Sequence, residues 1–155
     1  MNLNLNMDWT DFQILYWFFK KSGRVLYLGE IDLLNFTLLN AEEVYLVTPQ
    51  KINLKNPRLK KFEENPEYLN LSDLPRSFDR IINFLPMNIV TSFKIMGRFV
   101  GLLGKNKKLL IKVEAEKKQM KYCDIILDEL LPKLNLEKVM CFEMEGNKYV
   151  IGKKL

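Results

Sequence analysis

Arg24-Val-Leu-Tyr-Leu-Gly-Glu30 is the stretch that decides the fold. Four hydrophobic residues run into a Gly-Glu pair, and a further apolar stretch, Ile31 to Asn40, follows directly. A short continuous apolar run bounded by turn residues is typical of a buried strand in a parallel sheet. A strand that ends in glycine and leads into a helix is where open α/β folds place their ligands. We therefore expect the first, central strand of such a sheet over 24–28 and a helix over 31–40.

Length and composition indicate one globular domain. The 155 residues are 48 % hydrophobic and 28 % charged, which is ordinary for a globular chain with a sound core. We expect a single domain over 1–155, with 1–7 as a flexible end. Ion-pairing residue types outnumber the small polar ones, which is compatible with a thermophile as the source.

No stretch of the sequence predicts export or a membrane span. The first seven residues lack a basic start followed by an apolar core. The longest apolar run, Ile14 to Phe19, falls far short of the ~20 residues that cross a bilayer. The two cysteines, Cys123 and Cys141, are isolated within apolar patterns, as is typical of buried thiols in a cytosolic protein. We expect a cytoplasmic protein with no membrane partner.

Histidine is absent from the chain, which limits the chemistry. Its absence excludes a Ser-His-Asp or Cys-His catalytic arrangement and a His-ligated zinc site. Any general base must be Asp, Glu, Lys or Tyr. Glu30 and Asp32 could bind a metal or a cationic ligand, but two carboxylates are a weak signal and Asp32 can equally start the helix. We expect no metal.

The net charge of +5 has two interpretations. It indicates nucleic acid or another anionic partner, or it reflects a Lys-rich solvated surface with Glu interspersed. One basic run could contact phosphates. It contains Lys51, Lys55, Arg58, Lys60 and Lys61. Glu63 and Glu64 close this run, which favours a solvated linker.

An aromatic helix is predicted near the N-terminus. Asp8 is placed as its N-cap, Asp11 lies in its first turn, and Ser22-Gly23 ends it. Phe12 to Phe19 is apolar all round except at Gln13, so this helix needs cover on more than one side. Two alternatives remain: the helix packs on the sheet with some aromatics exposed, or it is a surface for a homodimer or another protein partner.

The rest of the chain continues the α/β pattern. Strands are expected at 43–47, 59–63 (short and edge-like), 80–84, 108–113, 137–145 and 149–152, an irregular link at 50–58, and helices at 88–103 and 116–131. We place Gly104 as the C-cap of the first helix, Pro132 as the end of the second, and Gly146-Asn147 as a hairpin turn. This order predicts an α/β fold: a three-layer α/β/α sandwich with a mostly parallel Rossmann-like sheet and a C-terminal antiparallel hairpin.

A Rossmann-like sheet that ends in such a hairpin resembles the class I S-adenosylmethionine-dependent methyltransferases, over most of the chain. Arg24 to Gly29 resembles the family's first motif, a hydrophobic strand followed by an acidic residue, one position and Gly. Leu71-Ser-Asp-Leu-Pro75, followed by Ser77 to Ile82, resembles the family's adenine-side loop and fourth strand. The resemblance implies S-adenosylmethionine as cofactor. The residues it would place around the cofactor are Gly29, Glu30, Thr48, Asn70 and Leu71.

The sequence departs from the family's cofactor motifs at several positions. Tyr27 replaces the acidic residue of the first motif, Glu30-Ile31-Asp32 replaces small residues, and Thr48 replaces a ribose-binding acid. Asn70 stands for the adenine-side Asp and can still hydrogen-bond. Each lost polar contact costs ~1–3 kcal/mol. Two or three losses amount to ~10²–10⁴ in affinity. Cofactor binding in the usual pose is therefore expected to be altered or lost.

Asn83-Phe84-Leu85-Pro86 follows the fourth strand, where methyltransferases of nucleic acids and protein amides often carry Asn/Asp-Pro-Pro-aromatic. The resemblance makes Asn83 the candidate catalytic and substrate-binding residue, with Phe84 and Pro86 also binding substrate and Phe84 stacking on a base. The alternative is that Asn83 caps the next helix and Phe84 packs in the core. Polar residues after the fifth strand, Lys112, Glu114, Glu116, Lys117 and Lys118, could supply an acid or base, or form a solvated helix start.

Two functional hypotheses follow. The first is a methyltransferase-like domain with lost or altered cofactor binding, active only if the cofactor still binds. The second is a non-catalytic Rossmann-like binding or scaffold subunit, which acts through a protein partner or a homodimer at Phe12 to Phe19. The sequence leaves catalysis undecided between them.

Overall fold

The computed structural model describes residues 9–19, 21–29 and 33–155. Its elements in chain order are α1 Trp9–Phe18, β1 Ser22–Leu28, α2 Leu34–Leu39, β2 Ala41–Val47, β3 Leu59–Phe62, η2 Leu71–Asp73, β4 Phe78–Asn83, α3 Ile89–Phe99, η3 Val100–Leu102, β5 Leu103–Glu114, α4 Met120–Lys133, β6 Leu136–Met144 and β7 Asn147–Lys154. These bounds agree with most predicted elements to within a few residues. Asp8 and 30–32, at which a helix cap and part of a helix are predicted, lie outside the described residues.

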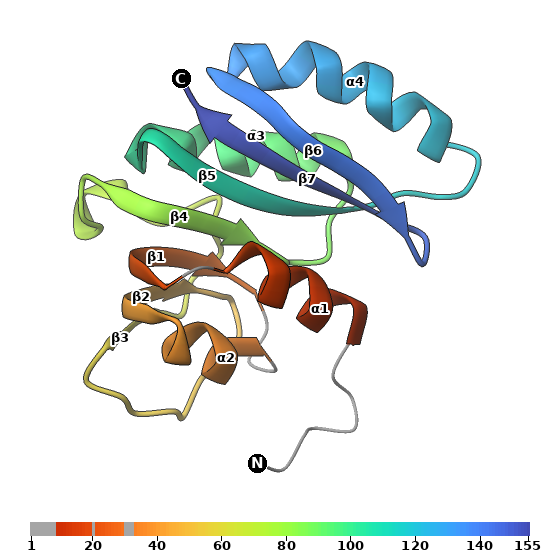
Figure 1. Cartoon of the computed structure of the whole chain (residues 1–155). Coiled ribbons are helices and arrows are strands. Elements are labelled where there is room, and N and C mark those ends of the chain that lie inside the picture. The colour runs from red at the N-terminus through yellow and green to blue at the C-terminus, as the bar shows by residue number, and fades with distance from the viewer. Residues whose placement is uncertain (1–8, 20, 30–32) are drawn as a thin grey trace.

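The strands of the described residues form one sheet in the order β3-β2-β1-β4-β5-β7-β6 (Figure 1). Strands β3, β2, β1, β4 and β5 run parallel to one another, and β7 is inserted antiparallel between β5 and β6. Strand β1 pairs with β2 on one side and with β4 on the other, so the chain order reverses there. The predicted α/β class, parallel centre and antiparallel hairpin are confirmed.

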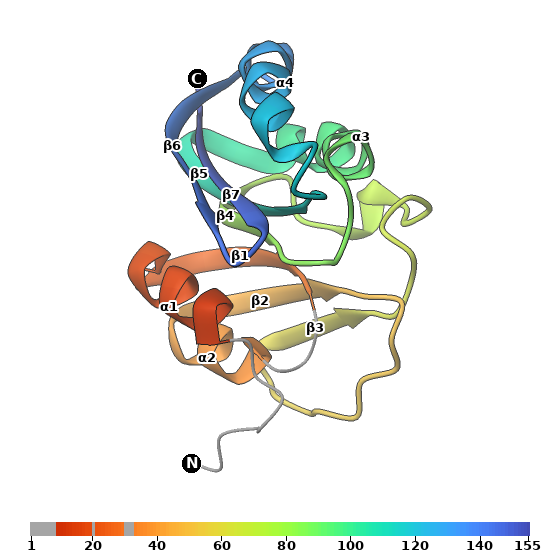
Figure 2. The same ribbon diagram turned by 90° about the vertical axis from the view of Figure 1, so that its right-hand side faces the viewer.

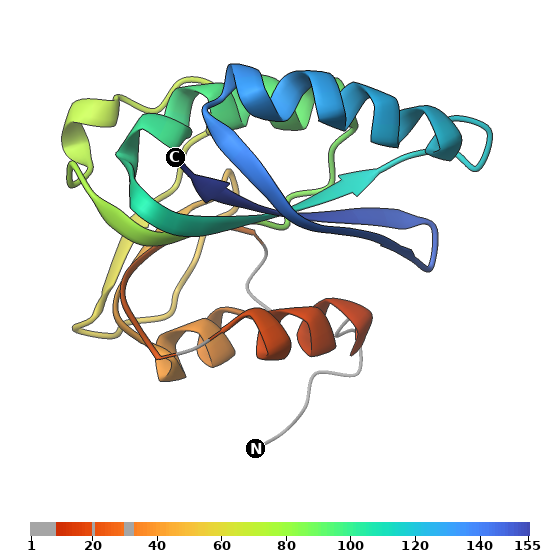
Figure 3. The same cartoon turned by 45° about the horizontal axis from the view of Figure 1, so that its top comes forward.

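The helices cover both faces of this sheet. Helices α1 and α2 lie on one face, and α3 and α4 on the other (Figures 2 and 3). Each face has its own hydrophobic core, with Leu15 and Leu34 on the α1/α2 side and Met96 and Leu127 on the α3/α4 side. All four side chains are fully buried, which explains why the strands between them are apolar on both faces. The three-layer prediction is confirmed.

Helix α1 packs its aromatic residues mainly within the protein. Phe12, Phe19 and Phe36 form a cluster in which the Phe36 ring lies 5.1 Å from Phe12 and 6.0 Å from Phe19. Tyr16 and Trp17 are exposed, at 67 % and 58 %. The packing alternative therefore holds for most of the helix, and two aromatic side chains face outward. None of the helices in the described residues has the length and apolar character needed to cross a bilayer.

The predicted helix over 88–103 is too long at its end. Asn88 caps α3, accepting a bond from the Thr91 amide at 2.9 Å, but Leu103 is already extended and begins β5. Gly104 is therefore a strand residue and not a helix C-cap. A Cβ on Gly104 would lie 3.1 Å from Lys107 Cγ and 3.3 Å from Ser77 Oγ, so close approach of these side chains favours glycine at this position.

The second predicted helix is wrong at both ends. Helix α4 begins at Met120 and not at Glu116, and it runs through Pro132 to Lys133. The Leu134 amide still donates to carbonyls in the last turn, so Pro132 does not stop the helix. Asn135, with a φ of 60°, ends it in the left-handed conformation.

The hairpin turn lies one residue earlier than predicted. Glu145 and Gly146 both have positive φ, 51° and 79°, which is the pattern of a two-residue type I′ turn. Asn147 already pairs with Met144 across the hairpin. The irregular link predicted over 50–58 and the short edge strand predicted after it are confirmed, and between β3 and β4 the chain forms only the short η2 turn.

Candidate functional site

The carboxyl ends of the parallel strands form the edge where this architecture places ligands. Leu28 of β1 is in register with Val47 of β2 and with Asn83 of β4. The residues that follow, Gly29, Thr48 and Phe84, therefore emerge side by side at this edge. Hydrogen bonds fix the arrangement, because Phe84 N donates to the Leu28 carbonyl at 2.8 Å and Thr48 N donates to a β3 carbonyl at 3.1 Å.

Gly29 is in contact with the ring of Tyr27. A Cβ placed on Gly29 would lie 2.6 Å from both Cζ and Oη of Tyr27, far inside van der Waals contact. The Tyr27 side chain is 1 % exposed and belongs to the core on the α1/α2 face. Packing of this ring by itself explains why residue 29 is glycine. Glu30, predicted beside it, lies outside the described residues.

Thr48 directs its hydroxyl to its own backbone turn. The side chain is buried, and its Oγ1 accepts a bond from the Gln50 amide at 3.3 Å. Thr48 also lines a pocket of about 350 Å³ at the carboxyl edge. The other lining residues follow β2, β3 and β4 or belong to α3: Pro49, Gln50, Asn65, Pro66, Glu67, Leu85, Pro86, Met87, Thr91 and Ile95. This pocket has an apolar wall and a few polar groups, the pattern of a small-molecule site.

Asn70 and Leu71 lie apart from Gly29 and Thr48. The Asn70 side chain is exposed and accepts bonds from the Ser72 amide and hydroxyl, at 3.1 and 2.9 Å, so it caps η2. Figure 1 shows this yellow-green stretch beside the start of β4, away from the carboxyl edge. Neither residue is among the described ones that line the 350 Å³ pocket. The structure thus brings together Gly29 and Thr48 from the predicted cofactor set, but not Asn70 and Leu71.

Arg98 of α3 explains the path of that loop. Its guanidinium donates to the carbonyl of Pro66 and, at 2.6 Å, to the carbonyl of Leu69. These bonds hold the chain after β3 against α3, and Pro66 lines the pocket as a consequence. Asn65 and Glu67, on either side of Pro66, also line this pocket, whereas Asn70 is not among the described residues that line it. Their position directly after a short edge strand was the signal that could have indicated them.

Asn83 has its amide engaged within its own turn. It is fully buried, its Oδ1 accepts from the Leu85 amide at 3.1 Å, and its Nδ2 lies 3.5 Å from the Met87 sulfur. Phe84 is also buried, and its ring meets Tyr149 edge-on at 6.3 Å. Structural roles are therefore favoured for both Asn83 and Phe84. The predicted helix-capping role of Asn83 is wrong, however, because Asn83 stabilises the turn after β4 and Asn88 caps α3. Pro86 is exposed at the pocket.

A buried polar triad lies beside these residues and was not predicted as a unit. Asp11 of α1 accepts a bond from Lys112 Nζ of β5 at 2.8 Å and from the Tyr149 hydroxyl of β7 at 2.6 Å. The Asp11 and Lys112 side chains are only 9 % and 12 % exposed. An ion pair with a shared phenol fastens α1 to the sheet. Sequence reasoning named Asp11 and Lys112 separately, but 101 positions separate them.

The other residues after β5 make no comparable cluster. Glu114, Glu116 and Lys117 are exposed, which agrees with a solvated connection to α4. Within the described ranges no group of three metal-ligating side chains comes together. The cations of the basic run over 51–61 are exposed, and two of them donate to nearby carbonyls, Arg58 to Ala41 at 3.1 Å and Lys61 to Ile52 at 2.8 Å.

Both cysteines are free thiols in weakly reactive surroundings. Burial raises the pKa of Cys141 to about 11, with Lys148 opposing it and Asp124 adding to it. Burial likewise raises the pKa of Cys123. Because the thiolate is the nucleophile, neither residue is suited to catalysis near neutral pH.

Comparison with known proteins gives similarity at the level of structure. No family model matches the sequence, and no curated protein matches it. A candidate hemolysin from Streptococcus thermophilus has a TM-score of 0.71 and 12 % identity, covering 94 % of this chain and 64 % of its own, so this chain spans just under two thirds of that protein.

Two further structures are named as methyltransferases. A candidate S-adenosylmethionine-dependent methyltransferase from Listeria monocytogenes has a TM-score of 0.68 at 10 % identity, covering 95 % of this chain and 97 % of its own. The N-methyltransferase NodS from Bradyrhizobium japonicum, in complex with S-adenosyl-L-homocysteine, has a TM-score of 0.62 at 8 % identity, covering 86 % and 78 %. With its inserted antiparallel strand and these neighbours, the chain has a Rossmann-like fold that is also found in proteins named as methyltransferases.

Proposed function

We propose that this protein is a methyltransferase-fold binding domain that does not hold S-adenosylmethionine in the family's usual pose and does not transfer methyl groups. The contact between Tyr27 and Gly29 carries the proposal. In the family the first strand ends in an acidic residue and glycine, and the glycine lets the ligand approach the backbone. Here the acid is replaced by a buried phenol, and the glycine accommodates that ring.

Two more observations support the loss of the usual pose. Thr48 offers only a hydroxyl at the end of β2, and this hydroxyl already accepts a backbone bond. Asn70, the adenine-side candidate, is bonded to Ser72 and lies outside the described pocket lining. At ~1–3 kcal/mol for each missing polar contact, the expected loss in affinity is on the order of 10²–10⁴.

We include the absence of methyl transfer in the proposal because the side chain of Asn83, the candidate catalytic residue, is already hydrogen-bonded. Its amide is buried and is used by Leu85 and Met87, so a substrate amino group would have to displace both. The 350 Å³ pocket at Thr48 remains as the place for a small ligand in a different pose.

The aromatic helix supplies the proposed partner surface. Trp17 and Ile14 of α1 meet Met140, Phe142 and Met144 of β6 in an apolar groove of about 270 Å³. The strand β6 is also the edge of the sheet, with one side available for pairing. We propose that the protein acts through this surface, with a second copy of the chain as the first partner to test. A cytoplasmic location, with both cysteines reduced, belongs to the same proposal.

Calorimetric titration of the whole chain with S-adenosylmethionine and S-adenosyl-L-homocysteine tests the loss of cofactor. We expect no saturable binding below about 1 mM, about a thousandfold weaker than a micromolar site. Micromolar binding of either compound would overturn the proposal. NodS, whose structure contains S-adenosyl-L-homocysteine, is a positive control for the titrant.

The active-enzyme alternative is favoured by one observation, the close structural similarity to proteins named as methyltransferases. Micromolar cofactor binding that disappears in Thr48→Val, but persists in Asn70→Ala, would favour it.

Light scattering at several concentrations tests the partner surface. We expect a dimer that Trp17→Ala shifts to monomer, and a strict monomer at all concentrations would remove the self-association part of the proposal.

A further inference from the structure

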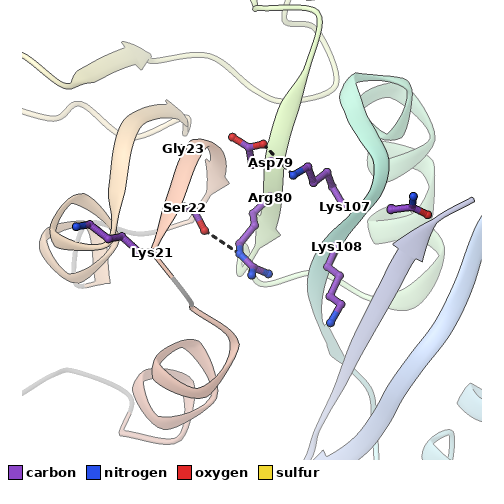
Figure 4. A pocket seen from close by; sticks show the side chains of 8 residues that line it. Lys21, Ser22, Gly23, Asp79, Arg80, Lys107 and Lys108 are labelled. Carbon is purple, nitrogen blue, oxygen red and sulfur yellow. Dashed lines mark hydrogen bonds and ion pairs between the residues drawn. The ribbon is translucent and has the colours of Figure 1, made fainter.

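A second pocket lies at the amino edge of the sheet, opposite the edge that holds Gly29 and Thr48. Its volume is about 330 Å³. Figure 4 shows the residues that line it: Lys21, Ser22, Gly23, Asp79, Arg80, Asn106, Lys107 and Lys108. Four of these side chains are cations and one is a carboxylate, so the described lining has a net positive charge.

A bulge in β5 forms this hollow. Phe78 is in register with Leu103, but Arg80 is already in register with Lys108, so five steps of β5 oppose two steps of β4. Asn106 takes a positive φ of 63° in the extra segment. The bulge moves β5 outward and returns it to the ladder at Lys108, directly beside Arg80.

Three cations lie in register across neighbouring strands next to this bulge. Arg80 of β4 is opposite Lys108 of β5, which is opposite Lys153 of β7. Like charges directly opposite each other destabilise a sheet. Glu137 pairs with Lys153 at 3.6 Å, but no carboxylate in the described part of the chain forms an ion pair with Lys108. Among the residues that the structure describes, the middle cation of the row therefore has no neutralising carboxylate.

Asp79, the carboxylate that lines the pocket, forms its contacts on the other side of the sheet. Asp79 accepts a bond from the Arg24 amide at 2.8 Å and pairs with Lys107 at 3.5 Å. In Figure 4, Asp79 and Lys107 meet on one side of the strands, whereas Arg80 and Lys108 extend to the other. Alternation along β4 requires this, because adjacent residues face opposite sides of a sheet.

Arg80 is held in a fixed orientation. Its Nε donates to Ser22 Oγ at 2.8 Å, and its guanidinium lies 4.7 Å from the Phe18 ring centroid. Burial lowers the pKa of Arg80 and Asp79 opposes that change, but an arginine stays charged. Its two Nη atoms have no hydrogen-bond partner among the residues that the structure describes. They are the donors that can pair with two oxygens of one anion.

We propose that Arg80 and Lys108, with Ser22 beside them, bind a phosphate group. A planar guanidinium fork held by Ser22 and a lysine point charge, both lining one hollow, are the elements of phosphate recognition. The phosphate would neutralise the row of like charges that the sheet otherwise maintains. The proposal does not depend on whether S-adenosylmethionine binds at the other edge.

The phosphate group would belong either to a free phosphate compound or to the backbone of a nucleic acid. The net charge of +5 is compatible with both ligands.

The test uses the whole chain at constant ionic strength, titrated calorimetrically with inorganic phosphate and with a single-stranded RNA oligonucleotide. Three variants are compared: Arg80→Gln, Lys108→Glu and Lys117→Glu. Lys117 is exposed near the opposite edge, so its variant changes the net charge as Lys108→Glu does. We expect the first two to weaken binding by about tenfold or more, and Lys117→Glu to leave inorganic phosphate binding nearly unchanged.

Thermal denaturation shows whether a variant loses binding because it is unfolded. Without phosphate, Lys108→Glu should melt at or above the wild-type temperature, because it relieves the like-charge row. Phosphate should raise the melting temperature of the wild type but not of Lys108→Glu. Binding of inorganic phosphate identifies a free compound, and binding of RNA alone identifies a polymer backbone. Failure of both, an equal loss in Lys117→Glu, or equal binding of succinate would overturn the proposal.

Discussion

The ring of Tyr27 lies against the backbone of Gly29, at a distance that leaves no room for a side chain there. A Cβ on Gly29 would be 2.6 Å from the phenol carbon and oxygen. These two residues occupy the first strand and its exit, where a nucleotide-binding sheet ordinarily receives its ligand. The glycine therefore has a packing role in this protein, and the consequence can be measured as stability.

Gly29→Ala should destabilise the fold by about 1–3 kcal/mol, the usual cost of overpacking a core. The buried Tyr27 ring cannot move away without disturbing the α1/α2 core. Chemical denaturation measures the change. Gly101→Ala is the matched control, because a Cβ there meets nothing within 4 Å. If both variants are equally stable, the Tyr27 contact does not constrain residue 29.

Asp11→Asn should destabilise the protein by about 3–5 kcal/mol, since it removes the carboxylate from a buried ion pair with Lys112. Tyr149→Phe should cost less, about 1.5–3 kcal/mol, because it removes one bond to a charged group and leaves the pair. Asp128→Asn serves as control, since Asp128 pairs with Lys138 at an exposed position. A change for Asp11→Asn as small as for this control would show that the triad does not hold α1.

Asp124 should make stability depend on pH. The hydrogen bond from Lys148 is the largest cause that lowers the pKa of Asp124, and burial opposes it. A carboxyl group with a lowered folded-state pKa stabilises the protein above its unfolded pKa, and this contribution is lost as the pH falls through the folded value. The difference in free energy of unfolding between wild type and Asp124→Asn should be constant above about pH 5 and shrink below about pH 4. A difference that grows on acidification would contradict this assignment.

The cysteines should react slowly in the folded protein. With the pKa of Cys141 raised to about 11 from an ordinary 9.0, its thiolate fraction near neutral pH is about a hundredfold lower than normal. Ellman's reagent should modify both thiols at least about tenfold faster in denaturant than in buffer. The variant Cys141→Ser separates the reaction rate of Cys123 from that of Cys141. Rapid labelling of native Cys141 would show that its surroundings are more open.

Local sequence patterns predicted the sheet well. The apolar run over Val25 to Leu28 predicted a buried parallel strand, and the helix predicted over 88–103 contains α3, in which Phe93 and Met96 are buried. Element ends were less certain, because they depend on neighbours. Gly104 was interpreted as a helix cap from its position alone, but Leu103 is already extended and in register with Phe78, so Gly104 lies in β5.

The sequence by itself determined the α/β architecture, the hairpin, and the presence of Tyr27 and Thr48 where the methyltransferase resemblance leads us to expect acidic residues. These properties are carried by residue type and by periodicity along the chain, which no distant contact changes. Only the tertiary structure decided which side chains meet. Asp11 and Tyr149 are 138 positions apart, and Arg80 is brought into register with Lys108 by a bulge that no local pattern indicates. Contacts of this kind are set by strand order and register, and these are fixed only when the whole sheet assembles.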